Sequence, residues 1–146
     1  MSRLSTPLSR AVIGLAFAVL LLAPTLPAAA SSARHIQVRF AAVGNSGVSG
    51  IVDLRQRSHA QGTRITVVAF GLMPDAQYLS LYYSNHVCAL EPYSVDDVIG
   101  GIYTANSVGV GTTRGVATDN LADINSVSVR RADFTLVACA DVHPGG

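Results

Sequence analysis

Lysine and tryptophan are absent from this 146-residue sequence, and only two cysteines occur in it. All ten basic residues are arginines, and nine acidic residues balance them without any strongly basic run. A near-neutral chain without such a run argues against nucleic acid or an anionic membrane as a partner. The sequence also lacks an amphipathic segment long enough to predict a useful helix, which points away from helical folds.

Residues suited to metal binding or catalysis are few and scattered. The four histidines are isolated from one another: His35, His59, His86 and His143. A copper or zinc site needs several converging ligands, usually with some local spacing. No G-x-S-x-G segment occurs, and the acidic stretch at Asp96 and Asp97 lacks the spacing of a calcium loop. We therefore predict no catalytic residues, no metal site and no cofactor.

The N-terminus has the three parts of a secretory signal. A leader with two arginines precedes an uninterrupted apolar run over Ala11–Ala23, and small residues follow at Ala28–Ala30. We expect a signal peptide over residues 1–30 and a single mature domain over residues 31–146, secreted or periplasmic and not membrane-bound after cleavage. The alternative is an uncleaved anchor, although the run is shorter than the about 20 residues that span a bilayer.

The rest of the chain is rich in strand patterns, in which β-branched and aromatic residues alternate with polar ones. The clearest example is the segment TRITVVAF at residues 63–70. The pattern predicts strands over residues 36–40, 48–54, 63–70, 78–83, 100–104, 114–118, 125–130 and 134–142. A turn of helix is predicted at residues 95–98. Short strands at such intervals are typical of an all-β fold, namely a Greek-key β-sandwich or barrel.

Strand 78–83 carries an aromatic pattern with two faces. The set expected to face the core is Leu79, Leu81 and Tyr83. The opposite set and a tyrosine of the following loop form the candidate binding surface: Tyr78, Ser80, Tyr82 and Tyr93. Tyrosine is favoured at interfaces because it joins a large apolar body to a polar tip. We expect a protein or glycan partner there, and the alternative is that these rings only cover the sheet beneath the loop over residues 91–99.

The two cysteines are Cys88 and Cys139. An even, minimal count in an exported domain predicts one disulfide bond. The alternative is two free, buried thiols.

Three short motifs resemble the copper/zinc superoxide dismutase family. Gly71-Leu72 with Pro74 precedes a strand and then Cys88, as in the family's G-L-x-P turn and first disulfide cysteine. The segment over residues 104–110 is similar to the family's T-A-x-x-x-G-V hairpin. The segment over residues 136–142 looks like its last strand, which carries the second cysteine. The resemblance implies a superoxide-dismutase-like fold with Cys88 and Cys139 bridged.

The family's metal chemistry does not carry over to this sequence. An ungapped match puts Ser80 and Tyr82 where the family has a copper-binding H-x-H pair, and the fourth copper ligand would fall near Val129. No histidine occurs over residues 88–100, and the loop with the family's active-site arginine shrinks to residues 131–133. Because a fold does not by itself imply an activity, we expect a secreted, non-enzymatic binding or structural module. The alternative is a dismutase-related enzyme with a degenerate or unusual metal site.

Overall fold

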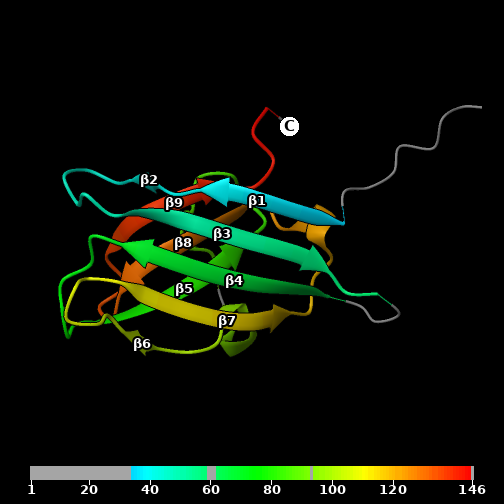
Figure 1. Cartoon of the computed structure of the whole chain (residues 1–146). Helices are drawn as coiled ribbons and strands as arrows, with labels where there is room; N and C mark the ends of the chain where they lie inside the picture. The colour runs from blue at the N-terminus through cyan, green and yellow to red at the C-terminus, as the bar shows by residue number, and fades with distance from the viewer. Residues whose placement is uncertain (1–33, 59–61, 93, 146) are drawn as a thin grey trace, which may run out of the picture. The chain divides into compact units, whose positions relative to one another are not determined.

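The structure is a computed structural model that describes residues 34–58, 62–92 and 94–145 (Figure 1). The predicted signal peptide and Tyr93 lie outside these residues. Within the described part the chain is all-β, with short 3-10 helices at Val95–Asp97 (η1) and Leu121–Asp123 (η2) and no α-helix. None of the described segments is a helix long and apolar enough to cross a bilayer.

The strands form two antiparallel sheets. The front sheet in Figure 1 contains, in spatial order, β1 (His35–Arg39), β3 (Ser49–Gln56), β4 (Thr63–Phe70) and β7 (Gly111–Ala117). The back sheet contains β2 (Ala41–Ala42), β9 (Leu136–Asp141), β8 (Ser126–Arg131), β5 (Gln77–Tyr83) and β6 (Tyr103–Thr104). The all-β class predicted from the sequence is confirmed.

Apolar side chains from the two sheets meet between them. In β4, alternate residues are buried and the residues between them are more exposed, as expected for a strand with one face on a core. β3 and β8 supply further core side chains. Among the core side chains with no exposed surface are Val52, Leu54, Ile65, Val67, Val127 and Val129. Burial of this apolar face is the main favourable term that stabilises the sandwich.

Several strand boundaries differ from the prediction. β4 spans Thr63–Phe70 as expected, and η1 falls within the predicted helical turn. β6 is shorter than the predicted strand over residues 100–104, because Gly100 and Gly101 have positive φ values of 68° and 88° that a strand does not adopt. β7 starts earlier than expected, at Gly111, and the short strand β2 was not predicted.

The predicted faces of β5 are reversed in the structure. The inward-facing set joins the core between the sheets, where Tyr82 and Ser80 lie opposite Val127 and Val129 of β8. The outward-facing set forms a second, smaller cluster with Cys88: Leu79, Leu81 and Tyr83. Because this cluster covers the outer face too, both sets are buried, and hydrophobicity alone could not tell the two faces apart.

Candidate functional site

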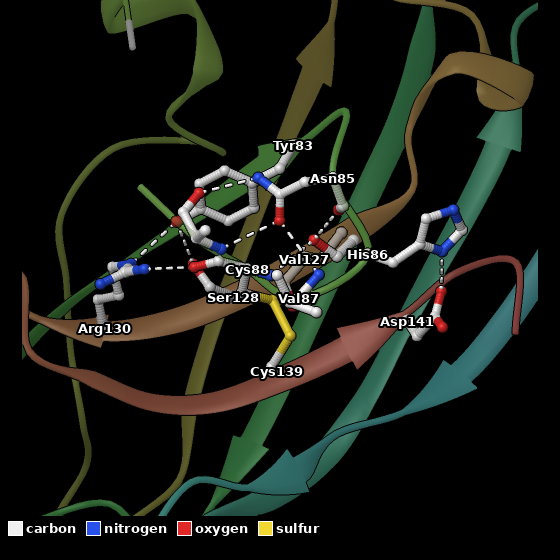
Figure 2. The surroundings of a disulfide bond; sticks show 12 residues. Tyr83, Asn85, His86, Val87, Cys88, Val127, Ser128, Arg130, Cys139 and Asp141 are labelled. Carbon is white, nitrogen blue, oxygen red and sulfur yellow. Dashed lines mark hydrogen bonds and ion pairs between the residues drawn. A yellow bond between two sulfur atoms is a disulfide. The ribbon is translucent and has the colours of Figure 1, made fainter. Parts of the chain in front are cut away.

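A disulfide bond joins Cys88 and Cys139 with an S–S distance of 2.07 Å, which confirms the predicted bridge (Figure 2). Cys139 lies on β9, whereas Cys88 lies beyond the end of β5. The Cys88 amide also donates a hydrogen bond to the Ser126 hydroxyl of β8, at 3.2 Å. The bridge therefore holds the segment after β5 against the outer face of the back sheet.

Arg130 of β8 lies beside this bridge and is only 4% exposed. Its guanidinium donates hydrogen bonds to the Cys88 carbonyl at 2.6 Å, the Phe134 carbonyl at 2.7 Å and the Tyr83 hydroxyl at 2.9 Å. In Figure 2, dashed lines run from the guanidinium to Tyr83 and to Cys88. The Tyr83 hydroxyl also lies 2.9 Å from the Ser128 hydroxyl. This network places a fixed positive charge inside the outer face of the back sheet.

The described histidines are engaged in pairwise contacts. His86 Nδ1 lies 2.8 Å from Asp141 Oδ1, close to the disulfide (Figure 2). His143 Nε2 lies 3.2 Å from the Leu121 carbonyl, and His35 pairs with Asp53. His59 lies outside the described residues. Across the described part of the chain, no three His, Cys, Asp or Glu side chains come together as a group that could hold a metal ion.

The predicted tyrosine surface is not exposed. Tyr78, Ser80 and Tyr82 are 3%, 0% and 5% exposed, and Tyr93 lies outside the described residues. The Tyr78 hydroxyl accepts a hydrogen bond from the Met73 amide, and the Ser80 hydroxyl lies 3.1 Å from that of Tyr103. These partners satisfy the polar atoms inside the core. The predicted placement of these three residues on an outer surface is therefore wrong, because their strand face packs against the front sheet.

Burial also changes the ionisation of Tyr103. Removal of its hydroxyl from water raises the pKa of Tyr103 to about 12, against a weaker opposing effect of the hydrogen bond with Ser80. Its ring stacks on Tyr78 with the ring centres 6.3 Å apart. The two tyrosines thus act as part of the apolar interior at the β5–β6 edge.

The outer face of the front sheet carries a group of arginines that the sequence analysis did not single out. Along its strands, alternate residues are exposed, and the register arranges these residues in rows. One row crosses the four strands through His35, Arg55, Arg64 and Val116. The next row crosses them through Gln37, Asp53, Thr66 and Arg114. Residues from four separate segments are therefore brought onto one face of the sheet.

Asp53 is the acidic residue of this surface, and two basic side chains share it. Arg55 Nε donates to Asp53 Oδ1 at 2.8 Å, and His35 Nε2 lies 2.6 Å from Asp53 Oδ2. The hydrogen bond from Arg55 is the main cause that holds the pKa of Asp53 below its usual value, and the contact with His35 adds to it against the opposing effect of burial. The Asp53 carboxylate is thus already used by its neighbours on β1 and β3.

Arg64 and Arg114 have no such partner. Among the described residues, no carboxylate lies within ion-pair distance of either guanidinium, and Arg114 Nε donates only to the Thr66 hydroxyl, at 3.2 Å. Together with Asp53, Arg55 and Thr66 they line a hollow of about 400 Å³ that is open to solvent. A second hollow beside it is lined by Arg55, Gln56, Arg57, Ser58 and Arg64. The free N–H groups of Arg64 and Arg114 are therefore available to an anion from outside.

We call this surface the arginine face and define it by Arg39, Arg55, Arg57, Arg64 and Arg114. This face has five arginines and one acidic residue, Asp53. The rest of the described chain has three arginines and eight acidic residues. The near-neutral total charge hides this separation. Arginines in alternate positions of β-rich segments were a usable signal, but only the strand register shows that they share one face.

The comparisons with known proteins give no family for this chain. No protein-family model matches it, and neither does any curated protein.

Proposed function

We propose that this protein is exported and that its mature domain is a superoxide-dismutase-like Greek-key sandwich that acts as a non-enzymatic binding module. The observation that carries the binding role is the arginine face, on which Arg64 and Arg114 have no carboxylate partner among the described residues. Side chains of like charge repel each other when they are gathered on one surface. Binding of an anionic partner would relieve that repulsion.

The order of the strands supports the Greek-key part of the proposal. β5 pairs with β6, β7 lies against β6 from the other sheet, and β8 returns to pair with β5. The spatial order β8, β5, β6, β7 is that of a Greek key, in which the fourth strand lies beside the first. The bridge from the segment after β5 to the last strand also lies where the family resemblance puts it.

The surroundings of β5 support a scaffold without the family's metal chemistry. Ser80 and Tyr82, which the resemblance aligns with the copper-binding pair, are buried between the sheets. On the other side of the same sheet, the Arg130 guanidinium is buried against the Cys88 carbonyl. A fixed positive charge in a buried position opposes the binding of a second cation close to it.

Metal content and activity test the non-enzymatic part of the proposal. The full chain would be expressed in a host that exports it, purified, incubated with copper and zinc, and desalted. We expect no stoichiometric metal by mass spectrometry and no dismutation of superoxide above the buffer rate. One tightly held ion per chain together with dismutase activity would instead establish the alternative, an enzyme with an unusual site.

The mass of the exported protein tests the localisation. We expect the purified chain to begin at Ser31, because the small residues at Ala28–Ala30 suit cleavage after Ala30. A full-length protein that stays in the cell or in the membrane fraction would contradict export of a free domain.

A further inference from the structure

We propose that the arginine face binds an acidic polysaccharide, an extended sugar chain that carries carboxylate or sulfate groups on its repeating units. This inference rests on the proposed function, because it names the class of partner for the same face. The residues that carry it are Arg55, Arg64 and Arg114, which line one open hollow on the front sheet.

The spacing of these arginines suits a row of anions. Arg55 and Arg64 are direct partners across β3 and β4, and neighbouring strands lie about 4.8 Å apart. Arg114 lies opposite Thr66 of β4 and is therefore diagonal to Arg64, at a separation of about 7–8 Å. The planar arginine fork matches the oxygens of a carboxylate or sulfate and binds them through paired N–H groups. The forks of Arg64 and Arg114 can hold successive anionic groups of one extended chain, and Arg55, whose Nε and Nη2 donate to Asp53, adds positive charge beside them.

Keeping these positive charges together lowers the stability of the sheet. Like charges placed directly opposite each other in an antiparallel pair destabilise it, and Arg55 and Arg64 form such a pair. Asp53 offsets only part of this repulsion, because it already serves Arg55 and His35. A side-chain arrangement that works against stability is expected where a surface has a binding role. An anion seated over Arg55 and Arg64 would convert the repulsion into attraction.

The other side chains of the face favour a sugar chain over a nucleic acid. Gln37, Thr66 and Thr112 are uncharged polar residues of the same surface, and they can hydrogen-bond to sugar hydroxyl groups. Proteins that bind single-stranded nucleic acid stack the bases on aromatic rings. Among the outward-facing residues of the four described strands, Phe70 is the sole Phe, Tyr or Trp, and it lies six residues from Arg64, about 20 Å along β4.

Binding to defined polymers tests the inference. The exported protein would be titrated calorimetrically at low salt with polygalacturonate oligosaccharides, with dextran sulfate, and with neutral dextran as the control. We expect both acidic polymers to bind and neutral dextran not to bind. Arg64→Ala and Arg114→Ala should each weaken binding about fivefold, the usual contribution of one arginine near an anionic surface. The double variant should weaken it about 25-fold if the two contributions add.

Arg131→Ala is the matched control, because it removes one exposed positive charge from the back sheet. It should leave the affinity unchanged, and equal thermal stability of all variants would show that the losses are not due to unfolding. Equal weakening by Arg131→Ala, or no binding of either acidic polymer, overturns the inference. The inference is also overturned if single-stranded DNA or anionic vesicles bind more tightly than the acidic polymers at matched charge. It is overturned as well if the protein self-associates and Arg64→Ala abolishes that self-association, because the face then has another occupant.

The two proposals fail in different measurements. Loss of polysaccharide binding in a protein that holds no metal and shows no dismutase activity would refute this inference and leave the non-enzymatic scaffold intact. Stoichiometric metal with dismutase activity would refute the proposed function whatever the polymers do.

Discussion

Arg130→Ala is expected to destabilise the domain more than any substitution on its exposed surface. The change removes three hydrogen bonds from a charged donor, to the Cys88 and Phe134 carbonyls and to the Tyr83 hydroxyl. Hydrogen bonds of this kind contribute about 1.5–3 kcal/mol each, and removing one partner leaves buried acceptors unsatisfied. Because the three bonds share one group, their contributions do not add fully, and we expect a loss of about 4 kcal/mol in the free energy of unfolding.

Urea denaturation followed by far-ultraviolet circular dichroism measures this loss, with Arg131→Ala as the control. The neighbouring Arg131 is exposed, so its removal should change the free energy of unfolding by less than about 0.5 kcal/mol. If Arg130→Ala does not fold, Tyr83→Phe gives a milder test, because it removes only the hydroxyl between Arg130 and Ser128 and should cost about 1–2 kcal/mol. A loss below about 1 kcal/mol for Arg130→Ala would refute the view that this network stabilises the back sheet.

Two further predictions concern the disulfide and the buried tyrosine. Reduction of the Cys88–Cys139 bond, which spans 51 residues, should lower the free energy of unfolding by about 4 kcal/mol, measured by urea denaturation with and without reductant; an unchanged midpoint would contradict this. Folding raises the pKa of Tyr103 from about 10 to about 12, so the folded state favours the protonated hydroxyl. The resulting stabilisation is present in full below a pH of about 10, and it is lost as the pH rises toward 12. Thermal melts should show this alkaline loss, and Tyr103→Phe should reduce it.

Much of the fold could be predicted because strand signals are local. The segment over residues 63–70 shows strict alternation of burial in the structure, and its strand was predicted with the observed bounds. β5 shows where local signals fail. Leu79 and Leu81 are as apolar as any core pair, yet they face away from the front sheet and pack with Cys88 in a second cluster. Which face of a strand meets the larger core depends on what covers the other face, and that is a tertiary property.

The candidate sites also differ in how far the sequence could predict them. The pairing of Cys88 with Cys139 could be predicted because a domain with two cysteines allows only one bridge. The arginine face could not, because Arg64 and Arg114 are 50 positions apart in the sequence and become near neighbours only through the pairing of β4 with β7. The total charge of the chain could not reveal the arginine face, because it sums the charges of faces that the fold separates.

The separation of charge changes what the near-neutral composition means for partners. A weak net charge argues against long-range attraction to nucleic acid or membranes, but a partner close to the surface responds to local charge, because salt screens interactions beyond about 8–10 Å. Within that distance of Arg64 the described chain presents Arg55 and Arg114, with Asp53 already paired. The acidic residues of the loops lie outside this face, so they can repel a polyanion that approaches elsewhere and favour one orientation of binding. A near-neutral composition is therefore compatible with selective binding of an anion on the front sheet.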